Sequence, residues 1–196
     1  MPARCLTLGA VLLLLTACET YNPLEEFEPR EPARLQELRT VAAGYPVEQV
    51  EHGRYLVTLL ACGTCHTDGA LVGSPDPARQ FAGSRIGIAY SNPFENRNPG
   101  ILYPANITPD VQTGIGAWSD ESLNQLLRTG IDAGGKRHLP VMPWPEYAKL
   151  SDEDADAIVA FLRSLEPIRH SVPSNVPPGT PATAPYVHFG VYQSKR

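Results

Sequence analysis

Sulfur-bearing side chains are scarce in this chain of 196 residues, and each of them can therefore be considered separately. The chain has two methionines, Met1 and Met142, and four cysteines, Cys5, Cys18, Cys62 and Cys65. Met1 and Cys5 belong to an N-terminal segment that we expect to be removed. Met142 is then the one thioether that remains, and three cysteines remain for all covalent chemistry.

Runs of alternating apolar and polar residues, which mark half-buried strands, are also missing from the sequence. Twenty prolines and sixteen glycines are many for this length and predict long loops. The expected fold is therefore all-α, with extended loops between the helices.

An excess of positive charge is absent, since the formal net charge is −5. This charge argues against nucleic acid as a partner and provides no basic patch for a membrane surface. An acidic surface would suit a partner protein that carries a basic patch.

No hydrophobic run is long enough to span a bilayer stably. The longest candidate follows Arg4 and covers residues 6–15, which is the size of a secretory signal core. It ends in Leu15-Thr16-Ala17-Cys18, which resembles a bacterial lipobox. The resemblance implies a signal peptide over residues 1–17 and lipidation of Cys18; the alternative is an ordinary signal followed by an incidental cysteine.

Residues 18–46 are rich in Glu, Pro and Arg and have few large apolar side chains. This composition predicts a semi-extended tether, with a short helix allowed within residues 33–43. A lipid at Cys18 would anchor the protein to a membrane of the bacterial cell envelope, facing the periplasm.

The sequence Cys62-Gly63-Thr64-Cys65-His66 reads C-x-x-C-H, which is the attachment signal for a c-type haem. In such a site each thiol forms a thioether with a haem vinyl group, and the histidine that follows binds the iron. A thioredoxin-like thiol pair would need a βαβ setting, which the helical flanks do not suggest. A zinc site would need further N or S ligands, usually from a second cysteine pair.

Three helices are predicted in the domain 47–167. The first covers residues 47–60, and Gly53 inside it indicates close crossing by another helix unless that glycine is accidental. The second begins after the N-cap Ser119 and ends at Gly130. The third begins after Ser151 and continues toward Pro167; its Phe161 or Leu162 is the expected partner of Gly53. Residues 168–196 are expected to form an irregular tail that covers the domain or binds a partner subunit.

The loop at residues 67–104 is long enough to wrap around a porphyrin. Its apolar side chains could cover the ring or simply pack within the loop: Phe81, Ile86, Ile88, Tyr90, Phe94 and Tyr103. Pro75 is a candidate carbonyl acceptor for the N–H of His66.

Three residues further along the chain are candidate haem contacts. Met142, between two prolines, is the expected sixth iron ligand, with His138 as its rival and loop packing as the alternative. Trp118 could donate its indole N–H to a haem propionate or could pack in the core. The other histidines, His52, His170 and His188, are expected to be surface or structural residues.

The order of these features resembles a class I cytochrome c, with three main helices around one covalently bound haem. Asn106-Ile107-Thr108-Pro109-Asp110, residues 113–119 and residues 142–165 resemble the cytochrome c subunits of membrane-bound bacterial alcohol and gluconate dehydrogenases. Those subunits typically hold three haem domains, whereas this chain has a single C-x-x-C-H. The resemblance implies that Cys62 and Cys65 bind the haem covalently, with His66 proximal and Met142 distal.

Two axial ligands leave no open position on the iron, so we expect an electron-transfer protein and not an enzyme. Its expected partners are redox proteins: a dehydrogenase or quinol-oxidising complex as donor, and a terminal oxidase or soluble cytochrome as acceptor. One alternative is a haem enzyme or gas-binding protein with an open sixth position. Another is an interaction subunit of a larger respiratory complex, in which the haem is mainly structural.

Overall fold

The computed structural model describes residues 35, 40–41, 43–93, 95, 97–139 and 141–189. The predicted signal peptide, Cys18 and most of the tether lie outside these residues, as does Phe94. Within the described ranges, no helix combines the length and the apolarity that crossing a membrane would require. In chain order the elements are α1 (Val47–Leu59), α2 (Cys62–His66), the short 3-10 turns η1 (Ala70–Val72) and η2 (Pro77–Arg79), β1 (Gly87–Ala89), β2 (Ile101–Leu102), α3 (Asp120–Thr129), α4 (Trp144–Tyr147), α5 (Asp152–Arg163) and β3 (Tyr186–Val187).

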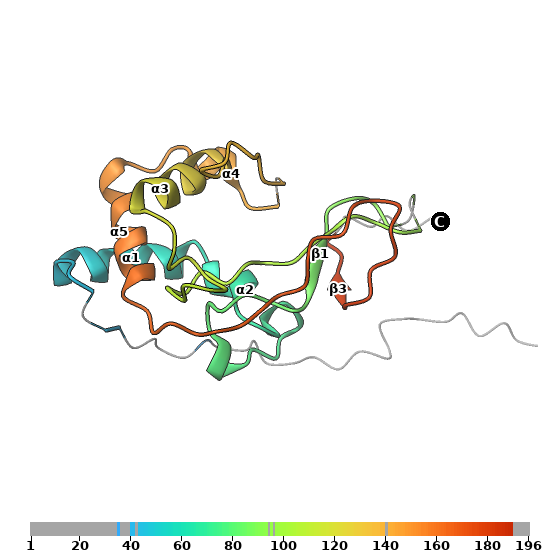
Figure 1. Ribbon diagram of the computed structural model, residues 1–196, viewed down its shortest axis with the longest axis horizontal. Coiled ribbons are helices and arrows are strands. Elements are labelled where there is room, and N and C mark those ends of the chain that lie inside the picture. Colours follow the sequence, from blue (N-terminus) through green and yellow to red (C-terminus); the bar gives the residue numbers. More distant parts are fainter. Residues whose placement is uncertain are drawn as a thin grey trace, which may run out of the picture. The chain divides into compact units, whose positions relative to one another are not determined.

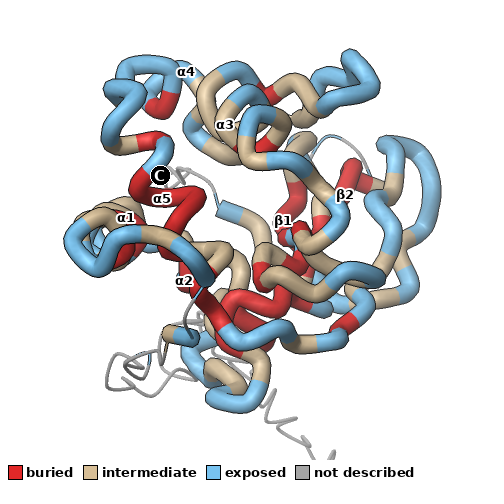
Figure 2. Tube along the Cα trace, turned by 60° about the vertical axis from the view of Figure 1, so that its left-hand side comes forward, coloured by how far each residue is buried: buried red, intermediate tan, exposed pale blue. Residues whose placement is uncertain are grey.

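Helices α1 and α5 cross in contact and form the centre of the helical part (Figure 1). A Cβ atom built on Gly53 would lie 1.9 Å from the carbonyl oxygen of Ala157 and 2.8 Å from the Cβ of Phe161. The predicted crossing at Gly53 is therefore confirmed, with Phe161 as one partner. Figure 2 shows α5 as an almost continuously buried segment, and Phe161 and Ile158 are among its fully buried side chains.

The helix ends follow the expected capping chemistry. The hydroxyl of Ser119 accepts a hydrogen bond from the backbone N–H of Ser122 at the start of α3. Gly130 ends α3 with a φ of 67°, in the left-handed region that glycine adopts without strain. At α5 the hydroxyl of Ser151 accepts from the N–H of Asp154. These three predicted boundaries are confirmed.

A short three-stranded sheet lies beside the helices. β1 is its central strand; it pairs antiparallel with β2 and parallel with β3. The expectation of an all-α fold is therefore only partly met, because these strands accompany the helices. They are two or three residues long, too short for a period-two pattern to be visible in the sequence.

The described part of the tail, residues 168–189, runs back across the domain to reach β1, as the orange-to-red trace in Figure 1 shows. Val172 and Val176 pack against a buried cluster that contains Ile101 and Tyr103. The hydroxyl of Tyr103 donates to the carbonyl of Ala184 over 3.0 Å. The described part of the tail therefore covers the domain, which is one of its two expected roles.

Residues Thr40 and Val41, which belong to the expected tether, also contact the helical part. Thr40 forms an antiparallel bridge with Leu165, and the N–H of Val41 donates to the carbonyl of Ser164 over 2.7 Å. Both pairings hold the chain before α1 against the end of α5.

Candidate haem-binding site

The C-x-x-C-H residues form the single turn of α2, which follows α1 after a left-handed residue, Ala61, with a φ of 53°. This backbone conformation is costly for a residue other than glycine, and such residues are concentrated at functional sites. Both thiols, of Cys62 and Cys65, are free and partly buried. The turn therefore brings two thiols and the imidazole of His66 together at one end of α1.

Burial raises the pKa of the Cys62 thiol to about 11, and it raises the pKa of the Cys65 thiol as well. Reactive thiol pairs of the thioredoxin kind instead have a lowered pKa, because the thiolate is their nucleophile. The electrostatics of α2 are therefore unlike those of a thiol–disulfide centre. Within the described residues, no group of three or more His, Cys, Asp or Glu side chains is arranged to hold a metal ion.

The imidazole of His66 is oriented by a backbone carbonyl. Its Nδ1 lies 2.7 Å from the oxygen of Ala105, so Nδ1 carries the proton and Nε2 is left with a lone pair for a metal. Burial lowers the pKa of His66, although the bond to Ala105 acts in the opposite direction. The acceptor is Ala105 and not Pro75, which the sequence had suggested.

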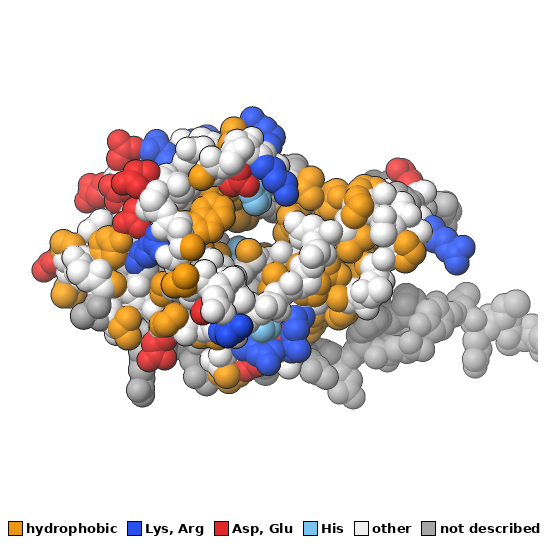
Figure 3. Space-filling view, viewed as in Figure 1, with side chains coloured by type: hydrophobic (Ala, Val, Ile, Leu, Met, Phe, Trp, Pro, Cys, Tyr) orange, Lys and Arg blue, Asp and Glu red, His pale blue; other side chains and the backbone are white. Residues whose placement is uncertain are grey.

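A hollow opens on the face shown in Figure 3, between the α3–α4 side and the α2 side, and hydrophobic side chains border it. The buried side chain of Tyr147 in α4 lies near both thiols. Its pKa is raised to about 12 by burial and by the nearby Cys62 and Cys65. Tyr147 has no motif in the sequence that would have identified it as part of this site.

Met142 lies in the loop between α3 and α4 and is partly buried. Its carbonyl accepts the N–H of Trp144 over 2.8 Å. The indole of Trp144 lies on Gly130, where a Cβ atom would come within 2.9 Å of the ring, and its N–H donates to Leu139. Trp144 therefore holds the Met142 loop against the end of α3; iron ligation by Met142 stays a prediction.

The rival ligand His138 has a partner of its own. Its Nε2 lies 3.1 Å from a carboxylate oxygen of Asp132, within the same loop. The N–H of Lys136, the proximity of His138 and the N–H of Gly134 hold the pKa of Asp132 below its ordinary value. In this arrangement Nε2 of His138 is engaged in a loop contact.

Trp118 lies where the helices meet. It packs with Ile115, Leu123 and Val159, and its backbone carbonyl accepts a hydrogen bond from Arg163. Core packing, one of the two expected roles of Trp118, is therefore present. Donation to a haem propionate stays a prediction.

The loop after α2 contributes mainly to the core. Phe81 is buried and meets Phe161 edge-on, with ring centroids 6.4 Å apart. Tyr103 and Ile88 are buried as well, whereas Ile86 and Tyr90 are partly exposed. His170 is also buried, so the expectation of a structural role for this histidine agrees with its position.

These residues suit a covalently attached c-type haem. Two adjacent thiols are available on one helical turn, and a neutral imidazole presents Nε2 because a carbonyl holds its Nδ1–H. Hydrogen bonding of the non-ligating nitrogen is the usual arrangement at histidines that bind metals. The hollow of Figure 3 opens on the side of the domain where Figure 1 shows α2.

Comparison with known proteins agrees with this chemistry. The family model for cytochrome c matches residues 50–166. The chain is 38% identical over 120 residues to the cytochrome c subunit of a quinone alcohol dehydrogenase from Gluconobacter oxydans, covering 61% of this chain and 22% of the relative. It is 35% identical over 120 residues to the gluconate 2-dehydrogenase cytochrome c subunit of Pantoea cypripedii, covering 61% and 24%.

One of the subunits of nicotinate dehydrogenase from Pseudomonas putida is 34% identical over 126 residues, which cover 64% of this chain and 9% of that protein. The chain therefore spans less than a quarter of the length of each of these relatives. The matched region runs from within α1 to just beyond α5 and supports the predicted class I cytochrome c fold. The resemblance inferred from the motifs is confirmed: this chain belongs to the cytochrome c family.

Proposed function

We propose that this protein is a mono-haem c-type cytochrome, attached to the bacterial cell envelope by a lipid, that carries single electrons. When bound, a c-type haem supplies a one-electron couple between ferric and ferrous iron. The observation that carries the proposal is the hydrogen bond that the imidazole of His66 donates to the carbonyl of Ala105. His66 directly follows the second of the two cysteines in α2. The hydrogen bond prepares one imidazole nitrogen to bind iron.

The residues take separate roles in this proposal. Cys62 and Cys65 attach the ring covalently, and their raised pKa values keep the free thiols protonated until attachment. His66 would ligate the iron through Nε2, and Met142 would ligate it through its thioether. Two protein ligands leave no position for a substrate, so the protein acts as a carrier and not as an enzyme.

Partners are proposed from the relatives. Two of them are named cytochrome c subunits of dehydrogenases, for alcohol and for gluconate. By analogy, electrons would reach this protein from a dehydrogenase or a quinol-oxidising complex and leave it to a terminal oxidase or a soluble cytochrome. The matched share of each relative is small, so the analogy extends to the haem domain and to the class of partner.

Haem attachment is tested on the exported, purified protein. We expect the tryptic peptide that contains Cys62 and Cys65 to carry the mass of one haem, and the reduced protein to show a c-type absorption spectrum. A Cys62→Ser, Cys65→Ser variant should lose the covalent mass. A wild-type peptide without added mass would overturn the proposal.

The sixth ligand is tested with a matched pair of variants. Met142→Ala should convert the ferric haem from low to high spin and allow the reduced protein to bind carbon monoxide at neutral pH. His138→Ala, in the same loop, should leave the low-spin spectrum unchanged. Rapid binding of carbon monoxide by the wild type would instead favour a gas-binding protein with an open position.

The lipid anchor is tested by replacing Cys18. The wild-type protein should partition with membranes and incorporate labelled fatty acid, whereas Cys18→Ser should do neither. Equal behaviour of both proteins would leave a haem domain with an ordinary signal peptide.

A further inference from the structure

His66 is held at two atoms by two different peptide groups. Its ring Nδ1–H donates to the carbonyl of Ala105 over 2.7 Å. Its own backbone carbonyl accepts the N–H of Gly83 over 2.8 Å. One peptide group therefore sets the direction of the ring, and the other sets the position of the backbone that carries it.

These two peptide groups pack directly against each other. A Cβ atom on Gly83 would lie 2.7 Å from the backbone nitrogen of Asn106 and 2.8 Å from the carbonyl carbon of Ala105. It would also lie 2.7 Å from a methyl group of Val172, in the tail. Gly83 has a φ of +84°, so both its conformation and its surroundings require glycine. A shift of either peptide would therefore be transmitted to the other.

The side chain of Asn106 ties the Ala105 peptide to the tail. Its amide NH₂ donates to the carbonyl of Ile168 over 2.7 Å and to the hydroxyl of Thr113 over 3.0 Å. Its amide oxygen accepts from the N–H and the hydroxyl of Thr108, over 2.9 and 2.8 Å. Asn106 is 3% exposed, and all its bonds lie within the protein, so it has little freedom to move.

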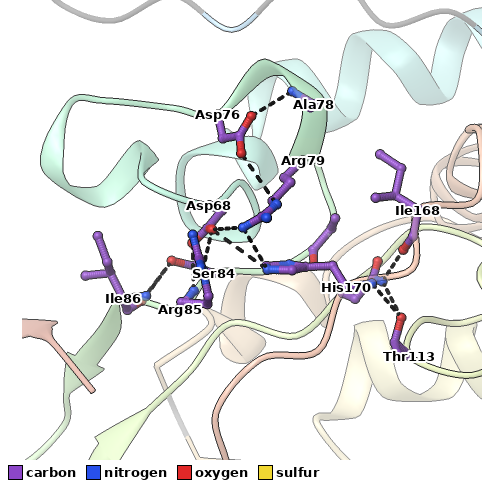
Figure 4. A network of polar contacts seen from close by, with 12 residues as sticks. Asp68, Asp76, Ala78, Arg79, Ser84, Arg85, Ile86, Thr113, Ile168 and His170 are labelled. Carbon is purple, nitrogen blue, oxygen red and sulfur yellow. Dashed lines mark hydrogen bonds and ion pairs between the residues drawn. The ribbon is translucent and has the colours of Figure 1, made fainter. Parts of the chain in front are cut away.

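The side chain of His170 ties the Gly83 peptide to the same stretch of tail. Its Nδ1–H donates over 2.8 Å to the carbonyl of Ala82, which belongs to the peptide group whose N–H binds His66. Figure 4 shows the imidazole of His170 directed toward Asp68 and Arg79, with its backbone held at Thr113. With Nδ1 protonated, Nε2 faces an N–H of Arg79 at 3.5 Å.

We propose that Asn106 and His170 are positioning residues that connect tail residues 168–170 to His66 and so tune the electron donation of its imidazole to iron. This inference rests on the proposed haem ligation by His66. The family match ends at residue 166, so the support of His66 through Asn106 and His170 involves a segment that lies beyond the matched region.

The direction of the effect follows from ligand chemistry. A strong hydrogen bond from Nδ1–H to a carbonyl makes the imidazole a better electron donor, which favours ferric iron. Loosening Ala105 weakens that bond and favours ferrous iron, so the reduction potential rises. Changes in such supporting contacts alter metal affinity by about tenfold or more. When a tenfold loss of affinity falls on the ferric state alone, the ferrous-to-ferric ratio changes tenfold, which corresponds to about 59 mV for one electron.

The experiment compares four variants of the haem-loaded protein by spectroelectrochemistry and by hydrogen exchange of the His66 ring N–H. Asn106→Ala and His170→Gln should each raise the potential by about 59 mV and speed this exchange. His170→Asn should behave like the wild type, because the asparagine amide can replace Nδ1 as the donor to Ala82, whereas glutamine places its amide nearer Nε2. Ser164→Ala is the control, since it removes a buried hydrogen bond of 2.8 Å from the Ser164 hydroxyl to the carbonyl of Ala160 at the end of α5; it should leave both readouts unchanged.

Unchanged potential and unchanged exchange in the first two variants would overturn the inference. So would an equal shift in His170→Asn and His170→Gln, or a shift of the same size in Ser164→Ala. If Asn106→Ala does not fold, the His170 pair decides. Each comparison requires a wild type that carries covalent haem. A colourless wild type would therefore overturn the proposed function, whereas the outcomes above overturn only the roles of Asn106 and His170.

Discussion

The crossing of α1 and α5 at Gly53 gives the sharpest quantitative prediction for stability. In Gly53→Ala the new methyl group would lie 1.9 Å from the carbonyl oxygen of Ala157 and 2.8 Å from the Cβ of Phe161. The closest atom belongs to the backbone of a fully buried residue, so no rotamer change can relieve the contact. The two helices must separate.

Two opposing effects set the size of the change. Alanine is favoured over glycine inside a helix by about 1 kcal/mol. Overpacking of a tight core usually costs about 1–3 kcal/mol, and a backbone contact this short lies at the upper end. We expect a net loss of roughly 2 kcal/mol in the free energy of unfolding, which for a domain of this size lowers Tm by roughly 5 °C.

The measurement is chemical and thermal unfolding of the haem-loaded protein, followed by far-ultraviolet circular dichroism. Gly134→Ala is the matched control, because Gly134 has no positive φ and its Cβ would meet only a side-chain oxygen, at 3.3 Å; its stability should change by no more than about 0.5 kcal/mol. A Gly53→Ala protein that is more stable than the wild type would mean that helix propensity outweighs the contact, and the crossing would be looser than described.

Two further predictions concern buried polar contacts. Asp68→Asn should cost about 1–3 kcal/mol, because Arg79 and Arg85 lose the buried carboxylate they share. The cost is limited because Arg79 is only half-buried and Arg85 is exposed, so water can solvate both. Burial alone would raise the pKa of Asp68, but hydrogen bonds from Arg85 and Arg79 outweigh it and hold that pKa low. The difference in the free energy of unfolding between the wild type and Asp68→Asn should therefore be present above about pH 4 and shrink as pH falls. Urea unfolding at a series of pH values measures this difference. Burial and the hydrogen bond that the Tyr45 hydroxyl donates to Asp120 raise the pKa of Tyr45 to about 12. The contribution of this hydroxyl to the free energy of unfolding should therefore be present below about pH 10 and be lost as pH rises through 12. Thermal unfolding across this range should show a smaller decline in Tyr45→Phe; an unchanged decline would contradict the assignment.

The helical part of the fold was predictable because its signals are local or periodic. Ser119, Gly130 and Ser151 are capping residues whose preference arises within one helical turn. Gly53 was informative because a glycine in a helix costs stability unless a neighbouring helix approaches closely. The C-x-x-C-H motif carries its chemistry in side chains, so the candidate attachment site was visible without a structure.

The sheet and the support of His66 could not be predicted in the same way. β1 to β3 are too short to show alternation, and the parallel pairing of β1 with β3 joins residues about a hundred positions apart. The acceptor for His66 is a backbone carbonyl, which every residue has, so nothing in the side chain of Ala105 distinguishes it from Pro75. Only the path of the chain decides which carbonyl faces the imidazole.

The tail illustrates why irregular segments can be structurally specific. Its prolines and lack of periodicity predicted an irregular segment with two expected roles, covering the domain or binding a partner subunit. The described residues 168–189 lie across the domain, and several of their contacts are made through backbone atoms. The carbonyl and N–H of Ile168 bind Asn106 and Thr108, and the backbone N–H of His170 binds Thr113. Such bonds constrain the chain path whatever the side chain is. Other positions depend on the side chain: the ring of His170 binds Ala82, the amide oxygen of Asn175 accepts from the N–H of Tyr103, and Val172 and Val176 pack against a buried cluster. It follows that substitutions should be tolerated where this segment binds through its backbone alone, and costly at His170, at Asn175 and at the two packed valines.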